Sequence, residues 1–156
     1  MTENETAAES GSAGDAELPA IEEILPHRRG MLFLESVTDY AEDRAAGRAR
    51  IPPALCGGDE GTPVVPVVLA MEMAAQLAAF HASMPAWRSG EAARDRGFLV
   101  RLTKVECERP TLEMDVPLDV RVELTGSMSR LAMYRVEVGP DGAPFVRGRL
   151  NIMSGG

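Results

Sequence analysis

The fold is decided by the stretch PVVLAMEMAAQLAAFHASM, residues 66–84. Almost all of it is Ala, Leu, Met and Val, so a helix formed by these residues is apolar on nearly every face. Such a helix must be surrounded by protein, because apolar surface is unfavourable in water. Pro66 suits the first helical position, since the N–H that it lacks would have no partner there. Pro85 is expected to end the helix.

The same stretch has to be tested as a membrane span. From Val64 to Met84 it is 21 residues of mostly apolar character, but Glu72 lies near its centre, with Gln76 and His81 further along. A carboxylate at the middle of a bilayer costs about 2.5–3.5 kcal/mol on insertion scales. The N-terminal residues also lack the basic and apolar regions of a signal peptide. We therefore interpret the segment as a buried helix of a cytoplasmic protein.

The segments on both sides of this helix have the patterns of β-strands. Before it, residues 31–37 resemble a buried strand and residues 44–51 alternate like a half-buried one. After it we expect four more strands, with a strong turn signal, Gly-Pro-Asp-Gly, between the last two. These four strands are residues 98–107, 118–125, 132–138 and 146–152.

This order of elements indicates an α+β fold. A strongly curved antiparallel sheet wrapped around the helix would cover it on most sides, which is the arrangement called the hotdog fold. We expect a single hotdog domain over residues 20–156. The sheet leaves an edge open, and edge-to-edge pairing of two subunits is the natural way to cover it. A dimer is therefore expected.

The charge of the chain is concentrated near its start. The net charge is −8, from 16 Lys and Arg against 24 Asp and Glu. Residues 1–25 hold seven of the acids and none of the bases, so the rest of the chain has 17 acids against 16 bases. This balance argues against nucleic acid and anionic lipid as partners. Residues 1–19 lack aromatic residues and are expected to form a disordered acidic tail.

Two motifs frame the first expected strand and the start of the helix. They are ILPHRRGMLFLE, residues 24–35, and VPVVLAMEMAAQ, residues 65–76. Together they resemble the 3-hydroxyacyl-acyl carrier protein dehydratase family, whose members have the hotdog fold. The likeness extends from about residue 21 to 153 and is greatest to the branch that acts in aryl polyene and related polyketide pathways, which RGRLN at 147–151 also fits.

The resemblance implies loss of water from a 3-hydroxyacyl thioester. A base takes a proton from C2, an acid protonates the leaving hydroxyl at C3, and an N–H at a helix start stabilises the thioester oxygen. Glu72 matches the helix carboxylate of the family, and Gln76 lies one turn further on the same face. The expected substrate-binding positions are Pro66, Val67, Val68 and Gln76. Val67 stands where the family often has glycine, which narrows the approach to the backbone but leaves the N–H available.

Other interpretations of the two polar helix residues remain open. Glu72 could instead hydrogen-bond across a dimer interface, because a carboxylate on an apolar helix must be paired or neutral. Gln76 could hold Glu72 or a water, or it could be an interface amide whose hydrogen bonds are satisfied.

The catalytic histidine is the main departure from the family. Gly58 aligns with the loop histidine that serves as the base in the fatty-acid enzymes, and the chain has only two histidines. His81 is nine residues after Glu72, about half a turn round the helix, and is interpreted as a core or interface residue. His27 is the remaining histidine in a family motif, so it is a candidate for the active site, with a structural role as the alternative.

The expected partner is acyl carrier protein, which presents the substrate on its phosphopantetheine arm. That carrier is strongly acidic, so an enzyme acting on it needs local positive charge. A stretch with a net charge of +2 follows the helix; its alternative interpretation is a solvated surface of mixed charge. Its basic residues are Arg88, Arg94, Arg96, Arg101, Lys104 and Arg109.

The leading functional hypothesis is a carrier-dependent 3-hydroxyacyl dehydratase, a lyase with no further cofactor. No metal site is expected, because Cys56 and Cys107 lie far apart and belong to no metal-binding motif. One alternative is a non-catalytic or half-catalytic subunit of a heterodimer, so both a homodimer and a heterodimer with another hotdog subunit stay open. Another alternative is a hotdog thioesterase, in which a helix carboxylate activates water.

Overall fold

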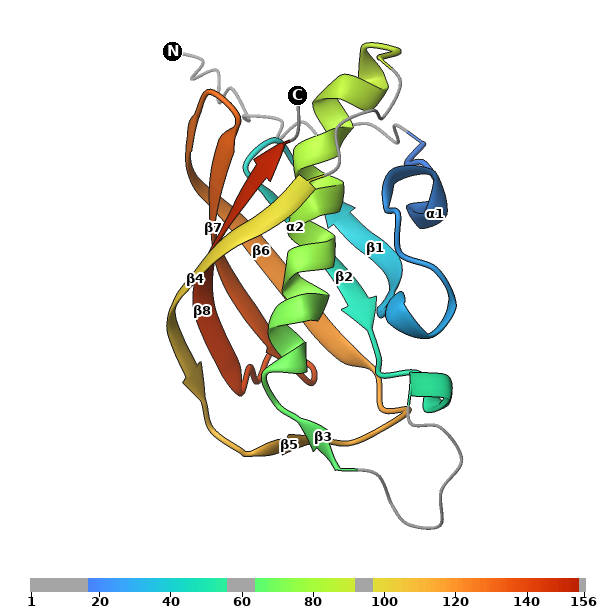
Figure 1. Cartoon of the computed structure of the whole chain (residues 1–156), viewed down its shortest axis with the longest axis vertical. Coiled ribbons are helices and arrows are strands. Elements are labelled where there is room, and N and C mark those ends of the chain that lie inside the picture. The colour runs from blue at the N-terminus through green and yellow to red at the C-terminus, as the bar shows by residue number, and fades with distance from the viewer. Residues whose placement is uncertain (1–16, 56–63, 92–96, 155–156) are drawn as a thin grey trace, which may run out of the picture.

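A curved antiparallel sheet and one long helix make up the fold. The computed structural model describes residues 17–55, 64–91 and 97–154. The helix is α2 (Leu69–Arg88), and Figure 1 shows it lying across the concave side of the sheet. The strands of this sheet are β1 (Leu34–Tyr40), β2 (Arg44–Ala49), β4 (Gly97–Cys107), β6 (Leu118–Met128), β7 (Leu131–Gly139) and β8 (Val146–Ser154).

The strand order is β1-β2-β6-β7-β8-β4, with every neighbouring pair antiparallel. The expected α+β hotdog arrangement is thereby confirmed. Smaller elements complete it. A second sheet pairs β3 (Val65–Pro66) with β5 (Thr111–Leu112), close to the start of α2 (Figure 1). The others are α1 (Ile21–Ile24) and the 3₁₀ turns η1 (Arg29–Met31) and η2 (Pro53–Leu55).

Several expected boundaries were wrong, and both prolines of the long helix were misassigned. Pro66 is not its first residue but lies in β3 opposite Thr111, and the helix begins at Leu69. A proline is tolerated in so short a strand because it has few ladder bonds to lose. Pro85 lies inside the helix and does not end it. In the last turn a proline costs only one intrahelical bond, and Ser89 still donates its N–H to the carbonyl of Pro85 at 3.1 Å.

The first strand also begins later than expected. Residues 29–31 form η1 and β1 starts at Leu34, so the buried Phe33 comes before the ladder. Of the predicted acidic tail, residues 1–16 lie outside the described residues, and Leu18 is partly buried against the core. Within the described ranges, no helix has the length and hydropathy needed to cross a membrane.

Helix α2 is buried on nearly all sides, as its composition predicts. Eleven of its residues are buried, and Gln76 and His81 are the polar ones among them. Glycines let the sheet approach it closely. A Cβ on Gly148 would lie 3.1 Å from Cε of Met71, and one on Gly47 would lie 3.5 Å from the side chain of Leu77. Each large apolar side chain buried in this way contributes about 1.5–3 kcal/mol.

His81 crosses the core from α2 to the sheet. Its Nε2 donates to the carbonyl of Ala41 at 2.9 Å, because a carbonyl can only accept. Nδ1 of a neutral ring must then accept, and the hydroxyl of Tyr134 donates to it at 2.9 Å. Burial lowers the pKa of His81, which keeps the ring neutral. The interpretation of His81 as a core residue agrees with this position.

The buried imidazole makes stability depend on pH. In the unfolded chain His81 binds a proton below a pH of about 6.5, whereas the folded chain resists protonation. The unfolded state therefore gains protons first as the pH falls, and the free energy of unfolding should decrease below that pH by up to about 1.4 kcal/mol per unit. Urea unfolding at pH 7.5 and 5.5 measures this loss. His81→Gln should reduce the pH dependence, whereas Tyr134→Phe should retain it. Equal pH dependence in wild type and His81→Gln would contradict the assignment.

Candidate active site

The two residues chosen as catalytic candidates lie against each other. His27 is in the segment between α1 and β1, and Glu72 is in the first turn of α2. Nε2 of His27 lies 3.2 Å from Oε1 of Glu72, with 32% and 29% of the two side chains exposed. The pair is therefore supported by the protein on one side and open on the other. A site that handles protons on a bound substrate needs this combination of support and access.

The apolar residues of α1 explain where His27 lies. Ile21, Ile24 and Leu25 are buried, which anchors the short helix against the core. Arg28 then closes the turn, because its guanidinium donates to the carbonyls of Leu25, His27 (2.7 Å) and Glu22 (2.8 Å). The sequence interpretation missed this bracing role, although the motif places an arginine directly after His27.

Gln76 holds the carboxylate in place. Its Nε2 donates to Oε1 of Glu72 at 3.1 Å and to the carbonyl of Met31 at 2.8 Å. Its Oε1 accepts from the N–H of Phe33 at 2.9 Å and from that of Leu34 at 3.1 Å. All four hydrogen bonds that an amide side chain can make are thus formed. Of the roles considered for Gln76, the structure supports the one in which it holds Glu72.

Each side chain of the pair also has an atom without a hydrogen-bond partner in the described part of the chain. Within the described residues Oε2 of Glu72 has no hydrogen-bond partner, because both contacts are to Oε1. Nδ1 of His27 is buried and also lacks a partner there. An unpaired buried nitrogen is costly, so its presence here is typical of a functional site. One proton can pass between the two side chains across the 3.2 Å contact.

The start of α2 differs from what the motif suggested. The N–H of Val67 is not available, because it donates to the carbonyl of Pro110 at 3.0 Å. Pairing of β3 with β5 brings Pro110 to this position, which no local pattern reveals. Val68 is 53% exposed, and its N–H has no backbone acceptor among the described residues. The first open N–H groups of the helix are therefore those of Val68 and Leu69, where the helix dipole favours negative charge.

The structure does not place the other residues singled out in the sequence at this site. Gly58 and Cys56 lie outside the described residues, as do Arg94 and Arg96. His81 lies nine residues further along α2 than Glu72. In the described part of the chain, no three His, Cys, Asp or Glu side chains come together as metal ligands.

The basic residues do not form one compact patch. Arg88 is at the end of α2, Arg101 and Lys104 are on β4, and Arg109 follows that strand. From Arg101 to Arg109 the extended chain spans about 26 Å. Arg109 stacks on the ring of Phe145, with 3.9 Å from its guanidinium carbon to the ring centroid.

The chain matches a known protein family over most of its length. The sequence model of the ApeP-like family, described as ApeP dehydratase, matches residues 19–155. The dehydratase heterocomplex ApeI:P from Xenorhabdus doucetiae has a similar fold, with a TM-score of 0.75 and 23% identity over 87% of this chain and 91% of that one. A comparison with curated protein sequences finds no match.

Two further solved structures share the fold at lower similarity. One is the HP0420-homologue from Helicobacter felis, with a TM-score of 0.58 and 17% identity over 90% of this chain and 92% of that one. Another is a mutant of the thioesterase PA1618 from Pseudomonas aeruginosa, with a TM-score of 0.54 and 9% identity over 76% and 78% of the two chains. Likeness at this level establishes a shared fold.

The amide of Gln76 can be tested by its effect on stability. Gln76→Leu leaves the buried N–H groups of Phe33 and Leu34 without partners, which costs about 1–3 kcal/mol for each, and it also removes the bond to the half-buried carbonyl of Met31. Urea unfolding should therefore show a loss of about 3 kcal/mol or more. Ser83→Ala removes only an intrahelical bond to Ala79 and is the matched control, with an expected change of at most about 1 kcal/mol. Equal stability of the two variants would contradict the role given to Gln76.

Proposed function

The chain belongs to the ApeP-like dehydratase family, and on this basis we propose that it dehydrates 3-hydroxyacyl thioesters carried on acyl carrier protein, with His27 and Glu72 as its acid–base pair. The observation that carries the proposal is the 3.2 Å contact between the two side chains within one chain. The loop position at which the fatty-acid enzymes have their histidine is Gly58 here, and His27 supplies an imidazole to the helix carboxylate instead.

The proton balance of the reaction closes within this pair. The proposed reaction requires a proton on Glu72 and a free ring nitrogen on His27. His27 takes the proton from C2, the C2–H electrons form the C2=C3 double bond, and Glu72 protonates the hydroxyl that leaves C3 as water. The pair then consists of an imidazolium and a carboxylate. Transfer of one proton across their contact returns both side chains to their neutral forms.

The start of α2 is proposed to stabilise the negative charge that develops during the reaction. Abstraction of the C2 proton moves negative charge onto the thioester oxygen. In this proposal the N–H groups of Val68 and Leu69 stabilise that charge, because they are the first ones at the helix start without a backbone acceptor among the described residues. Val67, which is buried, and Pro66, which is exposed, directly precede these N–H groups and are proposed to contact the substrate.

Docking of the carrier protein is proposed along β4. Arg109 is held just beyond the end of this strand by the Phe145 ring, and Arg101 and Lys104 are exposed on the strand itself, where they would lie beside a subunit paired to its edge. An acidic carrier would find positive charge along this side of the molecule, on the way to the start of α2. The phosphopantetheine arm would deliver the thioester, so the enzyme needs no cofactor of its own.

We also propose that β4 pairs with a second hotdog subunit. This strand is an edge of the large sheet, and it exposes Leu99, Val100, Leu102 and Val105. Successive side chains of a strand point to opposite faces, so both faces of β4 carry exposed apolar groups. A long apolar edge is prone to aggregate unless another strand covers it. A second copy of this chain or a related subunit would provide that strand.

The structure also bears on the half-catalytic alternative. In the half-catalytic alternative, this chain would lend Glu72 to a partner and His27 would only support the carboxylate, whereas the 3.2 Å contact also allows His27 to act as the base. This arrangement favours a chain that holds both groups. In the thioesterase alternative, the same carboxylate would activate water, and the product would be a free acid.

The reaction is tested with a carrier protein loaded with a 3-hydroxyacyl group. Incubation with the wild-type chain should convert it to the 2-enoyl form, seen as loss of one water by intact-protein mass spectrometry. Glu72→Gln and His27→Gln should each lower the rate by about 10²–10⁴-fold, the usual contribution of one acid–base group. Glu123→Gln, a change of the same kind on the exposed surface, is the control and should keep the wild-type rate.

Each other outcome of this assay has a definite meaning. Full activity of Glu72→Gln would refute the site. Release of free acid without an enoyl product would establish a thioesterase. Activity that appears only after addition of a second hotdog subunit would establish a heterodimeric enzyme.

The edge of β4 is tested by the oligomeric state in solution. Light scattering coupled to size-exclusion chromatography should show two chains per particle for the wild type. Leu102→Arg places a charge on the paired edge and should shift the protein to monomer, because burying an unpaired charge is costly. Val116→Arg is the matched control. Val116 is 37% exposed and Leu102 is 38% exposed, but Val116 lies outside β4. A wild-type monomer that does not associate with another hotdog subunit would contradict the proposal.

A further inference from the structure

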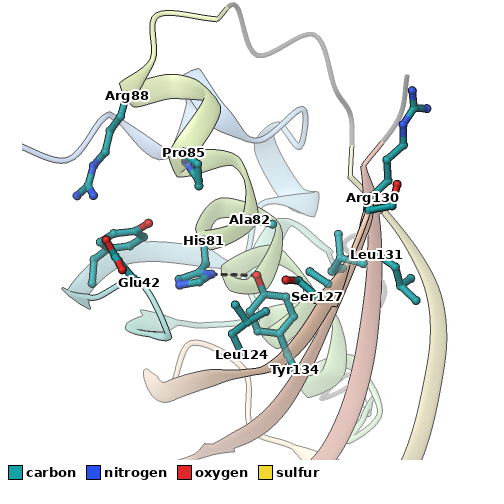
Figure 2. Close-up of a pocket in the computed structure, with 14 residues that line it drawn as sticks. Glu42, His81, Ala82, Pro85, Arg88, Leu124, Ser127, Arg130, Leu131 and Tyr134 are labelled. Atoms are coloured by element: carbon teal, nitrogen blue, oxygen red, sulfur yellow. Dashed lines mark hydrogen bonds between the residues drawn. The ribbon is translucent and has the colours of Figure 1, made fainter.

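A pocket lies at the opposite end of α2 from the dehydratase site. Its volume is about 560 Å³, and Figure 2 shows it between the last turns of α2 and the strands of the sheet. Sites for small molecules typically have about 300–1,000 Å³. His81, which lies in its wall, is nine residues after Glu72, which corresponds to about 14 Å along the helix axis. The pocket therefore shares no residue with the Glu72 site.

The interior of the pocket combines an apolar surface with a few polar atoms. Apolar lining comes from both the helix and the sheet: Ala82, Pro85, Leu124, Leu131, Ala132 and Ile152. This composition is typical of a ligand site, in which apolar walls provide most of the contact area and a few polar atoms fix the orientation.

The polar atoms in the wall have defined hydrogen-bonding roles. The hydroxyl proton of Tyr134 is committed to Nδ1 of His81, as the dashed line in Figure 2 shows. The oxygen of Tyr134 can therefore only accept a further hydrogen bond. Burial raises the pKa of Tyr134 and lowers that of His81, so neither group brings a charge into the pocket. Ser127 also lines the pocket and can donate or accept.

Charged residues line the pocket as well, namely Glu42, Arg88 and Arg130. Arg88 is the one whose position favours an anionic ligand. The guanidinium of Arg88 stacks over the ring of Tyr40 at 4.7 Å, and in the described part of the chain it has no carboxylate partner in an ion pair. Its N–H groups can therefore bind an anionic head group while the stacking keeps its orientation.

From this juxtaposition we infer a second small-molecule site that binds an apolar carboxylate, the chemical class of medium-chain fatty acids. The carboxylate pairs with Arg88, and the hydrocarbon tail lies on the apolar residues around His81 and Tyr134. Because every residue involved is remote from His27 and Glu72, this site goes beyond the proposed dehydration. Its ligand is bound without being converted.

The inference is tested by calorimetric titration of decanoate, below its micelle concentration, into the full-length protein. Wild type should bind one decanoate per chain in a saturable way. Arg88→Gln should weaken binding about tenfold or more, because a charge-assisted contact is lost. Arg121→Gln, the same change at an exposed position on β6, is the control and should bind like wild type. Decanol should bind more weakly than decanoate, and equally to wild type and Arg88→Gln.

Two more variants separate this site from the dehydratase site. Ala82→Phe fills the pocket from an exposed helix position, which tolerates a larger side chain, and it should abolish binding. Glu72→Gln should bind decanoate like wild type although it no longer dehydrates. Loss of binding in Glu72→Gln, unchanged binding in both Arg88→Gln and Ala82→Phe, or no saturable binding by wild type would overturn the inference. Decanoate binding by a chain without dehydratase activity would instead refute only the proposed function.

Discussion

The buried amide of Gln76 is the interaction on which the arrangement of the candidate active site depends. It is one of two buried polar side chains in the described part of the chain, and all its hydrogen-bonding capacity is used. Three of its bonds go to the backbone just before and at the start of β1, and the fourth goes to Glu72. Because the partner groups are themselves buried or half-buried, no water can substitute for the amide without cost. One side chain thus connects the position of the first strand with the orientation of the carboxylate.

The apolar character of α2 makes such a connection necessary. A helix that is buried on nearly all sides has few polar atoms with which to define its rotation and its height against the sheet. Hydrophobic packing is not directional, so several rotations and heights of the helix against the sheet would bury similar apolar surface areas. Gln76 and His81, five residues apart in the middle of α2, supply directional bonds to the β1 segment and to Tyr134 and Ala41 respectively. Glycines such as Gly148 then allow the sheet to close on the helix at the depth that these bonds require.

The errors at the start of α2 have a common physical origin. Pro66 was assigned from the local rule that prolines begin helices, whereas its actual place depends on a neighbour distant in the chain. Pro66 belongs to a strand because Thr111 lies opposite it. Val67 was expected to offer its N–H to a substrate, but the same pairing brings the carbonyl of Pro110 onto it. Long-range pairing of this kind leaves no periodic signal in one sequence, so only the folded chain could reveal it.

By itself, the sequence was sufficient for the fold and for the candidate residues. An apolar helix between strands of alternating pattern has to be wrapped by a sheet, and Glu72 and Gln76 have to share a helix face because they are four residues apart. The role of His27, by contrast, could not be chosen from the sequence. Nothing in its motif indicates what its imidazole contacts, since the segment after α1 could leave the core in many directions. Burial of Ile21, Ile24 and Leu25 against α2 selects the direction that brings His27 to Glu72, and that burial exists only in the tertiary structure.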